Sequence, residues 1–351
     1  MSLSFIQHYI QARKEDIIKA IIGGALMSFS SSLNLLLTGR ITGFSNICYK
    51  AFTAPSESSF RWGTILGLVV VSSSYTYLYG TQDHDSARQF LGDISIPLFL
   101  FSAFLVGFGT KLANGCTSGH GVCGLPRLSR RSIAAVLTFL SFGILTATIR
   151  SKYPFEDNGN LYYMGIAYAL QLEYIFVVVM CVSAFSILGL LFYQTMYKQS
   201  VEKTKDCLIS VLVGVIFGLG LIISGMVKKT KVLGFLVLNE NWDPSLMFVL
   251  FTAVGLNLLT FNFIIRAVKK PWIVNFCLDL PTLTNIDLKL ILGATTFGIG
   301  WGLSGLCPGP VLINLHIYIP HLLVFLVVLV IGQKVGESFG DFLDRNKLKS
   351  L

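Results

Sequence analysis

Two cysteine motifs in this 351-residue chain share a single spacing. The segment 107–116 (GFGTKLANGC) aligns without a gap with the segment 298–307 (GIGWGLSGLC), so Cys307 follows Cys116 at an offset of 191 positions (307 − 116). The same offset relates further pairs along the chain: Gly23 and Gly214, Arg40 and Lys231, and Gly43-Phe44 and Gly234-Phe235. Because distant motifs keep one register, the chain is predicted to be a duplicated unit, with one basic-glycine motif and one cysteine-glycine motif in each half.

Composition predicts an all-α integral membrane protein. Hydrophobic residues make up 53% of the chain and charged residues 13%, and the mean hydropathy is +0.69. Soluble domains carry about 25% charged residues, and a helix needs about 20 mostly apolar residues to cross a bilayer. We expect nine transmembrane helices: Ile17–Thr38, Trp62–Tyr79, Ile96–Leu112, Ile133–Ile149, Glu173–Tyr193, Cys207–Val227, Leu246–Ile265, Leu288–Leu306 and His321–Val335.

The expected spans divide the chain into two repeats. Residues 17–149 and 207–338 hold four spans each, and the linker 150–206 holds one; an N-terminal segment (1–16) and a C-terminal tail (339–351) flank them. Because the linker crosses once, the second repeat enters the membrane from the opposite side, which predicts inverted-topology repeats. Four segments are too short to cross and are expected to be re-entrant helices buried in the protein: Gly43–Phe52, Thr117–Leu128, Lys231–Leu238 and Pro308–Ile319.

The net charge of +9 is spread over short loops, which favours membrane orientation and attraction of anions over binding of nucleic acid. The loops on the N-terminal side hold 9 of the 27 Lys and Arg residues, and those on the other side hold 18. The positive-inside rule therefore predicts a multi-pass protein of the cell membrane, with its N-terminus outside and its C-terminus in the cytoplasm.

The run 114–132 (NGCTSGHGVCGLPRLSRRS) places small and polar residues beside an apolar span. Glycine has no Cβ, so the backbone amides at Gly115 and Gly119 can approach a solute closely. Thr117, Ser118 and the thiol of Cys116 add uncharged donors, which hold an anion without trapping it. The remaining candidate residues of the transport path are His120 and Cys123 in this run, Cys307, Pro308 and Gly309 in the second motif, and the cations Arg40 and Lys231.

Other interpretations of these residues stay open at this stage. Cysteine in a membrane helix is often a packing residue, and Cys123 has no counterpart in the second half. Cys116, His120 and Cys123 could ligate a metal, but Cys-x3-His-x2-Cys is not a standard zinc pattern. No nucleotide or cofactor fingerprint is present, so we expect no cofactor, no metal and no ATP-driven step. The cysteines expected to be packing residues are Cys48, Cys181, Cys207 and Cys277.

The first motif resembles the YeeE/YedE (sulphur transport) family of membrane proteins, through residues 114–124 (NGCTSGHGVCG) and 128–132 (LSRRS). Residues 224–227 (SGMV), 231–235 (KVLGF), 241–245 (NWDPS) and 305–310 (GLCPGP) resemble the partner subunit that bacteria often encode separately. The chain is thus similar to a fusion of two half-transporters. The family also has a cysteine after its first basic residue, whereas Arg40-Ile-Thr-Gly43 has none, and Cys48 lies a few residues further on.

The resemblance implies uptake of thiosulfate, or a related small sulfur-containing anion, through an hourglass-shaped protein in which thiols pass the ion along. Cys116 and Cys307 match the family's motif positions. We therefore expect a transporter, not an enzyme, with the lipid bilayer, a sulfur anion and a cytoplasmic sulfur-accepting protein as its partners. The alternatives are a membrane-embedded sulfurtransferase that forms a persulfide, and an accessory protein that delivers sulfur to a soluble acceptor.

Overall fold

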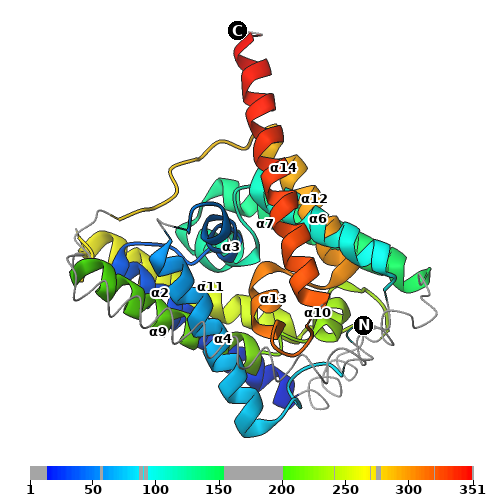
Figure 1. The fold of residues 1–351 in the computed structure, drawn as a ribbon, viewed down its shortest axis with the longest axis horizontal. Coiled ribbons are helices and arrows are strands. Elements are labelled where there is room, and N and C mark those ends of the chain that lie inside the picture. The colour runs from blue at the N-terminus through cyan, green and yellow to red at the C-terminus, as the bar shows by residue number, and fades with distance from the viewer. Residues whose placement is uncertain are drawn as a thin grey trace, which may run out of the picture.

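The structure is a computed structural model that describes residues 14–55, 58–86, 90, 94–153, 201–240, 242–268, 270–273, 278–319 and 321–349. Within these ranges every regular element is a helix, and the only extended pairing is an isolated bridge between Arg40 and Asp279. Figure 1 shows long helices arranged around several short ones. The all-α fold class is confirmed for the described part of the chain.

A long helix occupies eight of the nine predicted spans; the ninth, Glu173–Tyr193, lies outside the described residues. The long helices are α2 (Lys14–Thr38), α4 (Ser59–Tyr79), α6 (Ile96–Leu112), α7 (Arg130–Lys152), α9 (Val201–Ile223), α11 (Ser245–Ala267), α12 (Leu288–Ser304) and α14 (His321–Lys349).

Fewer of these helices qualify as membrane spans than the sequence predicts. By length and composition, five described helices and the stretch Leu288–Asn314, which joins α12 and the short helix α13 (Pro308–Asn314), could each cross a membrane. Helix α6 with the short helices after it would make a seventh span, bent by 44°. The reason lies in two elements: α6 has only 17 residues, and the second half of α4 contains Ser72, Ser73, Ser74 and Thr76. The predicted count of nine is therefore not confirmed.

Short helices lie in all four segments that were expected to be re-entrant. They are α3 (Phe44–Thr53), the π-helix η2 (Thr117–Gly124) with the 3-10 turn η3 (Leu125–Arg127), α10 (Lys229–Leu236) and α13 (Pro308–Asn314). Every residue of α13 is buried, and α3 lies among the long helices in Figure 1. The first residue of α3, of α10 and of α13 is buried.

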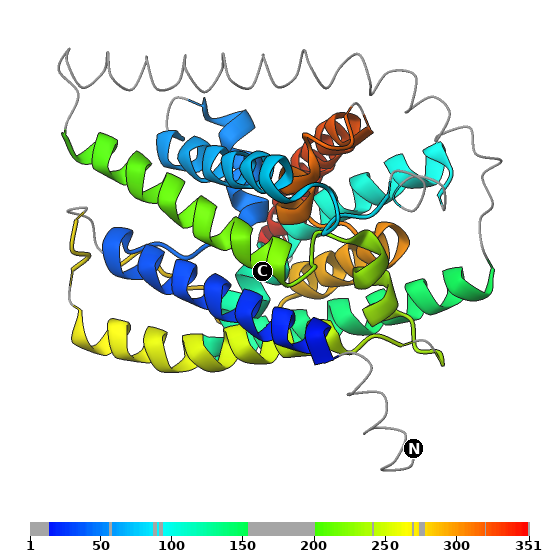
Figure 2. The ribbon, with the colours of Figure 1, turned by 90° about the horizontal axis from the view of Figure 1, so that it is seen from below.

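The packing of the long helices repeats itself when the two halves are exchanged. Helix α4 packs on α9 as α11 packs on α2, and α6 packs on α14 as α12 packs on α7. The contacts α2–α9 and α6–α12 join equivalent helices of the two halves. Figure 2 shows the neighbours α2 and α11, and α4 and α9, side by side. This pattern is what a pseudo-twofold axis between two interlocked repeats would produce.

One helix crossing shows the exchange residue by residue. A Cβ on Gly109 of α6 would lie 2.3 Å from the Phe297 nitrogen of α12, and one on Gly300 of α12 would lie 2.8 Å from the Val106 nitrogen of α6. Both pairs are related by the offset of 191 positions found in the sequence (300 − 109 and 297 − 106). Small residues let membrane helices approach this closely, so the repeated glycines set the α6–α12 contact.

Candidate functional site: a cavity between the two cysteine motifs

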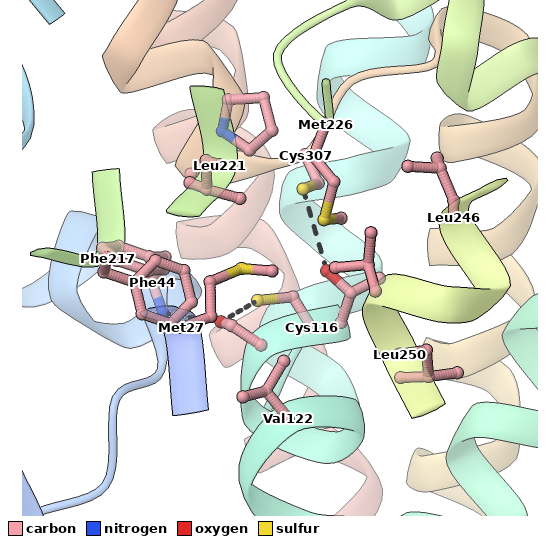
Figure 3. A pocket seen from close by; sticks show the side chains of 15 residues that line it. Met27, Phe44, Cys116, Val122, Phe217, Leu221, Met226, Leu246, Leu250 and Cys307 are labelled. Atoms are coloured by element: carbon pink, nitrogen blue, oxygen red, sulfur yellow. Dashed lines mark hydrogen bonds between the residues drawn. The ribbon is translucent and has the colours of Figure 1, made fainter. Parts of the chain in front are cut away.

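A cavity of about 70 Å³ lies where the two halves of the chain meet. A single water needs about 10–15 Å³ of such space, so the cavity has room for a small polyatomic solute. It is lined by residues of six helices, by the cap residues Cys116 and Cys307, and by the turn after α9 (Figure 3): Met27, Phe44, Cys116, Thr117, Ser118, Val122, Phe217, Leu221, Met226, Leu246, Val249, Leu250, Cys307, Gly309 and Pro310. Both cysteines of the repeated motif thus face one cavity.

The same local backbone places each cysteine. Asn114 follows α6 with φ 59°, and Gly305 follows α12 with φ 70°, which is the left-handed region that Asn and Gly adopt at least cost. These two positions also differ by the repeat offset. Each turn ends the long helix and leaves the cysteine two residues later as the extended N-cap of a short helix: Cys116 for η2 and Cys307 for α13.

Each of the two thiols contacts a different hydroxyl group of η2. The Cys116 sulfur lies 3.2 Å from Ser118 Oγ, and the Cys307 sulfur lies 3.8 Å from Thr117 Oγ1 across the boundary between the halves. The Phe44 amide at the start of α3 donates to Ser118 Oγ at 3.1 Å, and the Gly309 amide interacts with the Cys307 sulfur. Figure 3 shows the two sulfur–hydroxyl contacts as dashed lines on either side of the cavity.

The rest of the wall is apolar, and none of the fifteen lining side chains in Figure 3 carries a formal charge. The polar groups available to a solute are thiols, hydroxyls and backbone amides. Buried neutral donors of this kind can solvate an anion in part without neutralising it.

Cys48 is a third thiol near this site. It lies on α3, is fully buried, and lies near both Cys116 and Cys307, although it does not line the cavity. The sequence predicts that Cys48 is a packing residue, and its closeness to both motif cysteines is visible only in the structure.

Neither His120 nor Cys123 is among the residues that line the cavity between the thiols. The His120 ring donates from Nε2 to the Ala113 carbonyl at 3.2 Å, so Nδ1 accepts from the Ser132 hydroxyl at 3.1 Å. Both ring nitrogens are therefore engaged, which disfavours the metal-site interpretation. The Cys123 sulfur donates to the Thr42 carbonyl at 3.5 Å in a separate apolar cluster.

The glycines and the proline of the two motifs differ in whether they line a cavity. Gly115 packs against the His120 ring, where a Cβ would lie 2.7 Å from ring atoms. Gly119 lines a second, smaller cavity together with His120. Gly309 lines the central cavity, whereas Pro308 is buried beside it as the first residue of α13.

Arg40 and Lys231 form ion pairs instead of facing the central cavity. Arg40 binds both carboxylate oxygens of Asp206 at 2.7 and 2.8 Å, and Lys231 lies 2.8 Å from Asp16. Each carboxylate belongs to the first helix of the opposite half: Asp206 to α9 and Asp16 to α2. Exchange of the two halves therefore converts one ion pair into the other, as it does for the helix contacts. The expectation that these cations attract anions finds no direct support in this arrangement, because each is balanced by a carboxylate.

Known proteins match the chain in two separate parts. Residues 35–146 match the family described as sulphur transport, and residues 206–348 match a family of unknown function (DUF6691). A "Probable transporter" of Xylella fastidiosa (strain 9a5c) is 35% identical over 139 residues, which cover 39% of this chain and 94% of that protein. The chain belongs to the sulphur transport family.

A second relative extends this result. A "Probable transporter" of Xylella fastidiosa (strain Temecula1 / ATCC 700964) is 36% identical over 130 residues, which cover 37% of this chain and 86% of that protein. Each relative thus corresponds to less than half of this member of the sulphur transport family, in agreement with a fusion of two half-transporters. No solved structure matches the chain. Together with the apolar helices, the relatives show that it is a multi-pass membrane transporter.

Proposed function

We propose that this protein carries thiosulfate, or a related small sulfur-containing anion, through the cavity between Cys116 and Cys307. The observation that supports this proposal is the shared cavity itself. Two thiols 191 positions apart, each capping a short helix of a different half, face one small space. The matched left-handed turns at Asn114 and Gly305 place both thiols in the same way, which is not expected of cysteines that only fill space.

The chemistry of the wall suits a weakly hydrated anion. An ion that enters loses water, and the cavity returns only a few hydrogen bonds from thiols, hydroxyls and amides. Sulfate and phosphate are more strongly hydrated, so they lose more on entry than thiosulfate, which is larger and softer. We propose that the neutral wall selects among anions through this difference, and that Cys48, close behind the two motif cysteines, is the third thiol of the site.

We further propose that the two halves are inverted repeats, with the N-terminus outside and the C-terminus in the cytoplasm of a cell-membrane transporter. Passage of the anion then needs no covalent step, and the chain is not an enzyme. A soluble sulfur-accepting protein on the cytoplasmic side would consume the imported anion.

Uptake by purified protein in proteoliposomes tests the proposal. Radiolabelled thiosulfate, sulfite and sulfate are compared at equal concentration, with protein-free liposomes as the control. We expect thiosulfate to enter much faster than sulfate. Equal uptake of the two ions, or uptake of neither, would contradict the proposal. Mass spectrometry of protein incubated with thiosulfate distinguishes the transporter from the alternative enzyme. A stable sulfur adduct on Cys116 or Cys307 would indicate a persulfide-forming sulfurtransferase.

A further inference from the structure

A second cavity, of about 50 Å³, lies on the other side of η2 from the central cavity. Thr117 and Ser118 line the central cavity, whereas the next two residues, Gly119 and His120, line the second one. A single short helix therefore separates the two spaces. The second cavity shares Asn114, Arg131 and Leu283 with a larger polar recess of about 400 Å³ beside the C-terminal half of α14. It is thus placed between the thiols and the side of the protein where the C-terminus lies.

The second cavity differs from the central one in its charge. Two guanidinium groups line it, those of Arg127 and Arg131, and no carboxylate is among its lining residues. Arg131 is held in place from outside the cavity, because it donates to the Asn285 carbonyl at 2.6 Å and to Asp287 at 2.9 Å.

Arg127 is held by one atom only. Its Nε donates to the Cys123 carbonyl at 3.1 Å, and its two terminal nitrogens have no partner within the described part of the chain. The N–H donors of these two nitrogens lie in the plane of the guanidinium group, and this arrangement recognises oxyanions in a bidentate manner.

Neutral donors complete the wall. Ser129 Oγ accepts from the Ser132 amide at 3.3 Å, which leaves the hydroxyl hydrogen of Ser129 available to a ligand. A Cβ on Gly119 would meet no atom within 4 Å, so the backbone there is open to a solute. His120 contributes no charge, since its Nε2–H donates to a carbonyl and its Nδ1 accepts.

We infer that the second cavity is a distinct binding site for a small oxyanion, with Arg127 as its principal ligand. The inference rests on the proposed function in one respect: the anion that occupies it would be the one that has just left the central cavity. An anion held by neutral donors moves readily toward the guanidinium group of Arg127, whereas the charge of Arg131 is balanced by Asp287. This site is less selective than the central cavity, because guanidinium groups bind sulfate as well as thiosulfate.

Equilibrium dialysis of the purified full chain in detergent, with labelled sulfate or labelled thiosulfate, tests this site. Sulfate is excluded from the central cavity under the proposed function, so we expect one sulfate and two thiosulfates per chain. Arg127→Gln removes the charged donors and should weaken sulfate binding roughly 10- to 150-fold, the range expected for a lost hydrogen bond to an ion. The exposed neighbour Arg130 lies outside the cavity, so Arg130→Gln is the matched control and should change neither count.

The outcomes separate this site from the central one. In Arg127→Gln, one thiosulfate should remain, and its retention also shows that the variant is folded. Cys116→Ala should lose one thiosulfate but keep the sulfate. If Arg127→Gln keeps wild-type sulfate affinity, or if the wild-type chain binds no sulfate, the second site is refuted while the proposed function stands. If the wild-type chain binds only one thiosulfate and Arg127→Gln abolishes it, the second site is supported and the central one is refuted.

Discussion

Replacing the two motif cysteines should abolish most transport without unfolding the protein. Cys116 is 1% exposed and Cys307 6% exposed, and both sulfurs face the central cavity. Removal of a thiol from a wall that already adjoins a cavity should cost on the order of 1 kcal/mol of stability. Loss of a donor to a desolvated anion should cost roughly 1.5–3 kcal/mol, which corresponds to an approximately 10- to 150-fold lower rate of uptake at low substrate concentration.

The assay is initial-rate thiosulfate uptake in proteoliposomes that contain equal amounts of each variant. Cys116→Ser and Cys307→Ser keep a small donor and should retain part of the activity. Cys207→Ala is the matched control, because Cys207 is equally buried (2% exposed) but donates to the Ser59 carbonyl at 3.6 Å, away from the cavity. Its uptake should equal that of the wild type. Normal uptake by Cys116→Ala or Cys307→Ala would show that these thiols only pack, and the mechanism would be wrong.

Further predictions concern the frame around the site. Gly109→Ala and Gly300→Ala should each lower the melting temperature in detergent, because the added Cβ would meet backbone atoms at 2.3 and 2.8 Å. The control Gly255→Ala, on α11, should leave the melting temperature unchanged or raise it, because its Cβ would have no atom within 4 Å. Equal melting temperatures of all three variants would refute the close α6–α12 crossing. Asp206→Asn should destabilise more than Asp16→Asn, since Asp206 and Arg40 are 8% and 18% exposed whereas Asp16 is 44% exposed; a larger loss for Asp16→Asn would contradict the arrangement of the pairs. Protease treatment of sealed vesicles with a tag on each end should cleave the two tags from opposite sides, and protection of both from the same side would refute the odd number of crossings.

The repeated register predicted the central feature of the fold. Cys116 and Cys307 could be placed together because one offset relates their whole motifs, including the turn residues Asn114 and Gly305 that set their backbone. The sequence also indicated the four short helices, because glycines and Pro308 interrupt apolar segments there. Long apolar stretches located the long helices, because a helix that crosses a bilayer needs about 20 mostly apolar residues.

Other parts of the site could not be predicted from any pattern in the sequence. Four consecutive residues of η2, from Thr117 to His120, divide between two cavities, and neither the helix type nor its orientation can be read from so short a run. Met27 lines the central cavity from within an ordinary apolar helix. The sequence holds a hint of the partners of Arg40 and Lys231, because Asp16 and Asp206 differ by 190 positions, close to the repeat offset. Their pairing across the halves could not be predicted, because it depends on how the helices of the two halves pack together.

Protection of the thiols by substrate tests most directly whether Cys116 and Cys307 face one anion path. The purified protein is treated with N-ethylmaleimide at increasing thiosulfate concentrations, and the alkylation of each cysteine is measured by mass spectrometry, with sulfate at the same ionic strength as the control. Because both thiols face one cavity, we predict that thiosulfate protects Cys116 and Cys307 with the same concentration dependence and that sulfate protects neither. Protection of only one cysteine, or equal protection by sulfate, would contradict the shared path.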